Sequence, residues 1–321
     1  MNRNLVAALA ALLLAGVVAG YVVHARQSPA ARDLGAQSVT AHSVEPGLQV
    51  LSNGVLSTVS LSDPQGARAL TPLQCDRAHA AAGTVACLVP VDAFRGTHIQ
   101  ILDRQLRLQR EIPLTGFPNR LRVSASGRMV AWTLFVDGHS YATTGFSTSA
   151  GILDTKTGTL VPTLEDFAST VDGKPYAAAD KNFWGVTFAA DDNRFYATMS
   201  TGGQRYLVEG DFAARKVRAI ARNVECPSLS ADGRRIAFKA AVDGHPRNGW
   251  RLSVLDLATM AVTPTAETRS VDDQPLWLDS ETIAYALQRD DGVNDVWTVA
   301  ASSTGQPHLL VPQANSPALV N

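Results

Sequence analysis

Four polar segments, together with aromatic and charged residues in and beside them, contain the residues best suited to bind a partner. They cover residues 136–150, 164–182, 242–249 and 289–294. Aromatic rings supply apolar contact area and neighbouring charges supply orientation, a combination that suits recognition of a protein or a glycan. The candidate binding residues in and beside these segments are His139, Tyr141, Phe146, Asp166, Tyr176, Lys181, Trp184, His245, Trp250, Asp272, Asp273 and Arg289. For Trp184 and Trp250 a structural role stays open, because a ring where a loop meets a strand can also fill the core.

No motif for catalysis, metal binding or cofactor binding accompanies these residues. The segment GFSTSAG, from Gly145, resembles a nucleophile elbow only loosely, because Ser147 stands where that motif needs a glycine before Ser149. Glycine-rich phosphate loops, His-Glu zinc motifs and Cys-x-x-Cys pairs are absent, and the seven histidines are scattered. We therefore expect no catalytic residue, no metal site and no cofactor.

The three cysteines bear on the compartment in which the protein works. Cys75 and Cys87 lie on either side of the turn-like stretch RAHAAAG. A disulfide across so short a loop would contribute about 3 kcal/mol in the chain-entropy model, and it would persist only in an oxidising compartment. Two buried thiols are the alternative. Cys226 begins an expected strand and is expected to be a buried, inert thiol.

The N-terminus carries a targeting signal. After Arg3, the apolar run from Leu5 to Val23 has 19 residues, close to the roughly 20 that span a bilayer. We predict a membrane anchor helix within residues 1–25; a signal peptide cleaved after Ala25 or Ala30 is the alternative, and a buried helix of a cytoplasmic fold is a third. Residues 26–47, rich in Ser, Ala, Gln and Pro, are expected to form a linker.

The charge balance limits the possible partners. Lys and Arg number 28 against 29 Asp and Glu, so the net charge is −1 and there is no basic excess for phosphate contacts. Binding to nucleic acid is therefore not expected, and nothing in the sequence implies an oligomer. The expected disulfide and the expected anchor or signal peptide favour an extracytoplasmic protein that is held at the membrane or secreted.

The elements that position these residues are strands of a repeat. CPSLSADGRRIAF (226–238) recurs as RLRVSASGRMVAW (120–132), as GVTFAADDNRFYA (185–197) and, one residue shorter in its turn, as QPLWLDSETIAYA (274–286). Each copy is a short apolar strand, a polar turn and a second strand. Strand-like segments such as HIQILD (98–103) complete each unit, and a period of 40–50 residues is typical of a β-propeller.

The two ends of the chain supply the last blade. SPALV (316–320) matches the first strand of a repeat, and three further strands are expected between Leu48 and Thr71. We therefore predict an all-β fold over residues 48–321, a six-bladed β-propeller of four-stranded antiparallel blades. Pairing the C-terminal strand with the N-terminal strands closes the ring and removes exposed edges.

These repeats resemble the TolB-like propellers, a WD-like family with the pattern x-P-x-[aromatic]-S-P-D-G-x-x-[Ile/Leu]-Ala-[aromatic]. Residues 227–238 match it best, and the resemblance covers Leu73 to Val320. It implies a six-bladed propeller outside the cytoplasm, and for TolB itself a role in an envelope complex that binds a lipoprotein. Only a short linker stands where that family has a separate α/β domain, so the role in translocation is not carried over.

In such a ring the four polar segments share one rim, because loops after the second and fourth strands of a blade lie on the same side. Binding residues commonly lie in loops on a rigid scaffold. We therefore expect a non-catalytic module that binds an envelope protein or a cell-wall component through this rim. The alternative is a metal-dependent propeller hydrolase of the lactonase or esterase type.

Overall fold

The computed structural model describes residues 38–91, 95–136 and 147–320. The described residues from Val39 onward form one compact unit. The predicted anchor, Leu5 to Val23, and the predicted binding residues His139, Tyr141 and Phe146 lie outside the described residues. Among the described residues, no helix combines the length and the apolar character needed to cross a bilayer.

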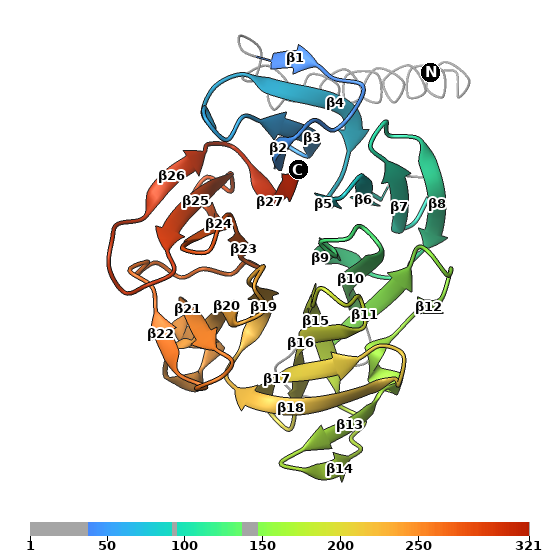
Figure 1. Ribbon diagram of the computed structural model, residues 1–321, viewed down its shortest axis with the longest axis vertical. Helices are drawn as coiled ribbons and strands as arrows, with labels where there is room; N and C mark the ends of the chain where they lie inside the picture. Colours follow the sequence, from blue (N-terminus) through green and yellow to red (C-terminus); the bar gives the residue numbers. More distant parts are fainter. Residues whose placement is uncertain (1–37, 92–94, 137–146, 321) are drawn as a thin grey trace, which may run out of the picture. The chain divides into compact units, whose positions relative to one another are not determined.

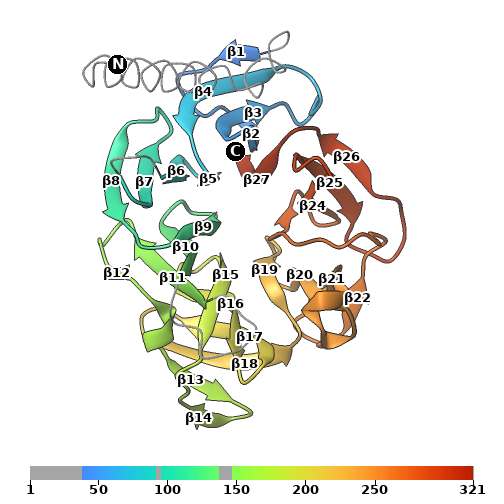
Figure 2. The same ribbon diagram turned by 180° about the vertical axis from the view of Figure 1, so that it is seen from behind.

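Six sheets, each built on four antiparallel strands, stand around a central axis (Figures 1 and 2), which confirms the predicted six-bladed propeller. Blade 1 contains β27 (Asn315–Val320), β2 (Gly47–Ser52), β3 (Val55–Val59) and β4 (Arg68–Gln74). Blade 2 contains β5 (Arg77–Ala81), β6 (Thr84–Val89), β7 (His98–Asp103) and β8 (Leu108–Pro113). Blade 3 contains β9 (Phe117–Val123), β10 (Met129–Val136), β11 (Ser147–Asp154) and β12 (Leu160–Val161).

The other three blades follow the same order from the centre outward. Blade 4 contains β15 (Asn182–Phe188), β16 (Arg194–Thr201), β17 (Gln204–Asp211) and β18 (Lys216–Arg222). Blade 5 contains β19 (Glu225–Leu229), β20 (Arg235–Ala241), β21 (Trp250–Asp256) and β22 (Val262–Pro264). Blade 6 contains β23 (Leu276–Trp277), β24 (Thr282–Gln288), β25 (Asn294–Ala300) and β26 (His308–Val311).

The ring closes as predicted, by pairing the two ends of the propeller. β27 runs antiparallel to β2, with Leu319 opposite Leu48. The described core consists of six buried apolar clusters, and each cluster draws its residues from two neighbouring blades. Both faces of a blade are therefore buried, which explains why β20 reads as the nearly continuous apolar run RIAFKAA.

The inner strands share a bulge that the repeat encodes. Gly185, Cys226 and Ser316 occupy the same place in three blades and have φ values of +65°, +50° and +51°. The strand register shifts beside each of them. At Gly185 a side chain has no room, because a Cβ there would lie 2.6 Å from Cα of Cys226. Glycine is thus required where blades 4 and 5 meet.

Three details differ from the sequence-based expectations. Blade 4 gains β13 (Ala168–Val171) and β14 (Lys174–Tyr176) from the segment expected to be a loop, because β13 pairs in parallel with β18. Blade 1 gains β1 (Ser38–Thr40), which lies within the expected linker and beside β4. The stretch RAHAA is the strand β5, and the turn is confined to Ala82 and Gly83.

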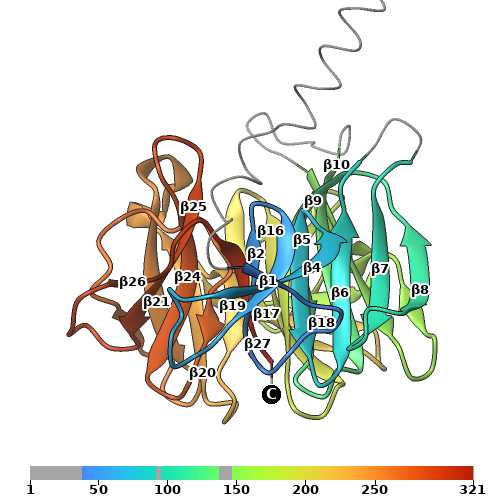
Figure 3. The same cartoon turned by 90° about the horizontal axis from the view of Figure 1, so that it is seen from above.

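The edge-on view (Figure 3) separates the ring into two rims. The loops that follow the second and fourth strands of each blade lie on one rim, which we call the elaborated rim. We call the opposite rim the plain rim. The elaborated rim includes the 3₁₀ helices η2 (Leu164–Asp166), η3 (Val242–Gly244) and η4 (Pro246–Asn248). The inner strands start at this rim, so their first residues surround the mouth of the central tunnel.

Candidate functional site

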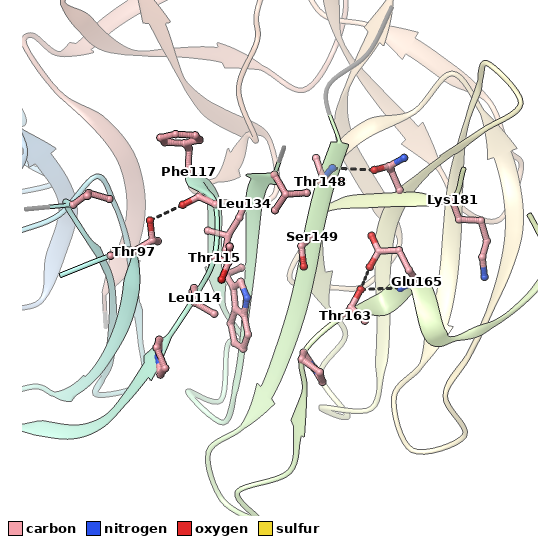
Figure 4. A pocket seen from close by; sticks show the side chains of 18 of the residues that line it. Thr97, Leu114, Thr115, Phe117, Leu134, Thr148, Ser149, Thr163, Glu165 and Lys181 are labelled. Carbon is pink, nitrogen blue, oxygen red and sulfur yellow. Dashed lines mark hydrogen bonds between the residues drawn. The ribbon is translucent and has the colours of Figure 1, made fainter. Parts of the chain in front are cut away.

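A pocket of about 1030 Å³ opens on the elaborated rim over blade 3 (Figure 4). We call it the rim pocket. Its walls come from the segments that lead into β9 and β15, from β10 and β11, and from the stretch before β7. Its lining includes Thr97, Leu114, Phe117, Trp132, Leu134, Thr148, Ser149, Thr163, Glu165, Lys181 and Asn182.

Apolar side chains form much of the wall of the rim pocket. Trp132 and Leu134, both on β10, are each only 2% exposed and belong to the core between blades 2 and 3. Gly151 on β11 lets the indole lie close, since a Cβ there would be 2.5 Å from Cζ2 of Trp132. Phe117, by contrast, is 61% exposed. A buried wall with one exposed ring suits an apolar side chain of a partner.

Glu165 is the titratable group of the rim pocket whose pKa is most perturbed. Its carboxylate accepts hydrogen bonds from the hydroxyl of Thr163 and, at 3.3 Å, from the backbone N–H of Phe183. Burial raises the pKa of Glu165 to about 7, although hydrogen bonds from backbone N–H groups, that of Phe183 among them, act to lower it. Glu165 therefore changes charge near neutral pH.

The other polar groups of the rim pocket are held by the fold. Nζ of Lys181 donates to the carbonyl of Phe167 and to Oγ of Ser169, both at 3.2 Å. Burial lowers the pKa of Lys181. Oδ1 of Asn182 accepts the backbone N–H of Thr148 at 2.9 Å. These contacts fix the polar edge of the rim pocket before any ligand arrives.

A second cluster, of charged residues, lies at the mouth of the central tunnel. Lys239 on β20 is 5% exposed and pairs with Asp272 and, at 3.9 Å, with Glu225. Glu225 is 2% exposed, and Arg205 approaches it at 3.1 Å. Burial raises the pKa of Glu225, while the charges of Lys239 and Arg205 oppose that rise. Burial also acts to raise the pKa of Asp272, but Lys239 and Arg120 outweigh it and the pKa is lowered.

The described members of the predicted set divide between these two sites and the loops around them. Lys181 lines the rim pocket, while Asp272 and Asp273 stand at the tunnel mouth. Trp250, half-buried at the start of β21, joins the tunnel cluster through Glu225. Trp184 is 5% exposed within β15, which gives it the structural role left open by the sequence.

The remaining described residues of the predicted set line neither site, although Asp166 is the neighbour of Glu165 in η2. Asp166 and His245 are exposed on the elaborated rim, in η2 and between η3 and η4. The hydroxyl of Tyr176 hydrogen-bonds Oγ1 of Thr201 at 2.9 Å. Arg289 pairs with Asp291 at 3.3 Å and with Asp295 at 3.6 Å in the turn between β24 and β25.

Sequence reasoning missed Glu165 and the charged residues of the inner strands. Arg77 on β5, and Arg120 and Arg122 on β9, all line the tunnel. The available signal was Arg-Leu-Arg in the first strand of a repeat, because residues two apart in a strand face the same side. Glu165 carries no such signal, because its environment forms only when the segment 164–182 folds back and brings the backbone N–H of Phe183 to its carboxylate.

The fold can be compared with solved structures. TolB from Acinetobacter baumannii superposes with a TM-score of 0.58 at 16% identity, over 85% of this chain and 66% of that chain, just under two thirds. A putative TolB from Agrobacterium tumefaciens gives a TM-score of 0.53 at 11% identity, over 85% of this chain and 92% of that one. The fold is a TolB-like β-propeller. No family model and no curated protein matches the sequence.

The TolB-like likeness concerns the fold, since the identities are low. An oligogalacturonate lyase in complex with manganese is also similar in outline, with a TM-score of 0.44 at 11% identity over 77% of this chain and 82% of that chain. Among the residues described for the TolB-like propeller, no three His, Cys, Asp or Glu side chains gather as a metal-binding group would require. The rim pocket and the tunnel cluster are its two candidate sites.

Proposed function

We propose that this TolB-like propeller is a non-catalytic binding module outside the cytoplasm, which holds a segment of an envelope protein at the elaborated rim. The observation that carries the proposal is the rim pocket, about 1030 Å³ in volume, with apolar walls from β10 and an exposed ring at Phe117. Such a pocket can take up one large apolar side chain, which commonly anchors a protein interface.

The chemistry of the rim pocket favours a polypeptide over a cell-wall glycan. A glycan needs several exposed rings for stacking and many outward hydrogen-bonding groups. Among the described lining residues Phe117 is the one exposed ring, whereas Trp132 is buried and Lys181 and Asn182 are engaged with the fold. Envelope location is supported by the disulfide between Cys75 and Cys87, which suits an oxidising compartment. The alternative of a metal-dependent hydrolase draws no support from the described residues.

Blocking the rim pocket tests this function. Ser149 lies in the pocket wall on β11 (Figure 4), so Ser149→Trp would fill the space a partner side chain needs. Ala214→Trp is the matched control, because Ala214 is exposed in a turn of the plain rim. Affinity capture from envelope extracts should recover a protein with the wild type and Ala214→Trp, and lose it with Ser149→Trp. Equal recovery with all three chains would contradict the proposal.

A further inference from the structure

Three arginines meet inside the central tunnel. Arg77 comes from β5, and Arg120 and Arg122 come from β9. With His79 and Asp273 they line a small cavity of about 30 Å³, which we call the arginine cavity. It shares Arg77, Arg120, Asp273 and Ser316 with a larger space of about 300 Å³, the outer chamber, at the tunnel mouth.

The arginine cavity has an excess of positive charge. Among the described lining residues, three guanidinium groups face one carboxylate, Asp273, whose Oδ2 already accepts the backbone N–H of Ala286 at 2.8 Å. Arg120 also pairs at 3.5 Å with Asp272 of the outer chamber, so the three arginines exceed these two carboxylates by one positive charge. Burial lowers the pKa of Arg122 to about 10, although Asp273 opposes the shift. Burial, with the nearby charge of Arg122, also lowers the pKa of His79 well below 6.5, so this imidazole is neutral at pH 7. A buried positive excess of this kind favours an anion.

Two donors in this cluster are unused. Among the residues that the structure describes, Nε of Arg120 and Nε of Arg122 have no hydrogen-bond partner, and the two residues are only 9% and 8% exposed. The terminal nitrogens are already engaged, since Nη2 of Arg120 donates to the carbonyl of Asp272 at 3.1 Å and Nη2 of Arg122 to that of Pro275 at 3.0 Å. The guanidinium planes are thus fixed while their Nε–H groups remain unpaired. A buried unpaired donor is costly, so an acceptor from outside would stabilise the site.

The sizes of the two spaces indicate which anion fits. A single water needs about 10–15 Å³, so the arginine cavity has room for roughly two oxygen atoms. A carboxylate brings two acceptor oxygens in one plane and pairs well with guanidinium donors, whereas a phosphate brings four oxygens. The outer chamber offers the uncharged polar groups of Gln288, Asn294 and Asn315, while Asp272 would repel a second negative charge.

We propose that the arginine cavity binds the carboxylate group of a singly charged ligand whose remaining atoms occupy the outer chamber. A small carboxylic acid and the C-terminus of a peptide both supply this group. The site is independent of the rim pocket, because the two share no lining residue. A failure here would therefore leave the proposed function of the rim intact.

Nitrogen NMR of the arginine side chains tests the proposal on the full-length chain in chloride-free buffer. The probes are acetate, the peptide acetyl-Ala-Ala-Ala with a free C-terminus, and the same peptide as its C-terminal amide. The Nε–Hε signals of Arg120 and Arg122 should shift saturably with the free acid, and the amide should bind about tenfold more weakly or worse. If acetate binds as tightly as the peptide, the ligand is a small carboxylic acid. If the peptide binds more tightly, the ligand is the C-terminus of a polypeptide.

Two variants make the test specific. Arg122→Lys keeps the charge but removes the Nε–H group, so affinity for the free-acid peptide should fall by about tenfold or more. Arg68→Lys is the control, because Arg68 is also buried but lies in blade 1, where it donates to Oγ of Ser52 at 2.8 Å. If Arg122→Lys does not fold, the wild-type titration decides alone. Equal binding of acid and amide, or no saturable shift, would overturn the proposal.

Discussion

The ammonium of Lys239 lies 4.1 Å from the centroid of the Trp250 ring, and the indole N–H of Trp250 donates to Glu225 at 3.2 Å. Lys239 also pairs with Glu225 and Asp272, so one buried cation joins the start of β19 to the segment that leads into blade 6. Trp250 therefore acts as part of the wall around a buried ion pair. Of the two roles that the sequence leaves open for Trp250, these contacts favour the structural one.

Removing this cation should destabilise the propeller. Lys239→Met leaves Glu225, which is 2% exposed, without one of its compensating charges. Breaking a buried ion pair on one side typically costs about 3–5 kcal/mol, and Arg205 moderates the loss here, so we expect about 3 kcal/mol. Urea unfolding at pH 7 measures it. Lys216→Met, an exposed lysine on β18, should change the unfolding free energy little; an equal loss in both variants would contradict the role given to Lys239.

Glu165 should make stability depend on pH in a defined window. Its pKa is about 7 in the folded chain against an ordinary value of 4.5, so between these values the folded state holds a proton that the unfolded state has lost. The unfolding free energy contributed by Glu165 must then fall as pH rises from 4.5 to 7, by at most about 3 kcal/mol, and stay level above pH 7.

The variant Glu165→Gln measures that contribution. The unfolding free energy of the wild type minus that of the variant, measured by denaturant unfolding at several pH values, should decrease between pH 4.5 and 7. Asp290→Asn, which removes an exposed carboxylate in the turn between β24 and β25 of blade 6, should give no such slope. A difference that rises with pH would mean that Glu165 is stabilised as a carboxylate in the folded chain.

The disulfide should hold blade 2 to the segment that enters it. Cys75 and Cys87 are bonded across a sequence separation of 12, so replacing both with alanine should cost about 3 kcal/mol by the chain-entropy model. Thermal unfolding of the wild type with and without reductant, beside the double variant, checks this. If reductant lowers the melting temperature of the double variant as much as that of the wild type, the bond is not the cause.

Gly185 should tolerate no side chain. Gly185→Ala places a Cβ 2.6 Å from Cα of Cys226 at a φ of +65°, so we expect a loss of about 2 kcal/mol or more. Gly173→Ala is the matched control, since Gly173 has a φ of +74° and a Cβ added there would meet no atom within 4 Å. The unfolding free energy of Gly173→Ala should fall by only about 1 kcal/mol, because backbone strain alone acts there. Equal losses in denaturant unfolding would show that the contact with Cys226 is unimportant.

The sequence predicted the blades well because each strand–turn–strand repeat is local. Residues 226–238 form β19, a turn and β20 as expected, and SPALV forms β27 against β2. β13 and β14 were missed because β13 depends on parallel pairing with β18, a contact that no local pattern encodes. The meeting of Arg77 with Arg122 was missed for the same reason, since the curvature of the ring brings β5 and β9 together at the tunnel.

Photo-crosslinking in living cells tests the central claim, that the elaborated rim is the binding face, most directly. The photoreactive p-benzoylphenylalanine would replace Phe117 at the rim pocket, 61% exposed, or Met260 on the plain rim, 41% exposed. The account predicts an adduct with an envelope protein from position 117 and none from position 260. Adducts of equal yield from both positions, or an adduct from position 260 alone, would contradict it.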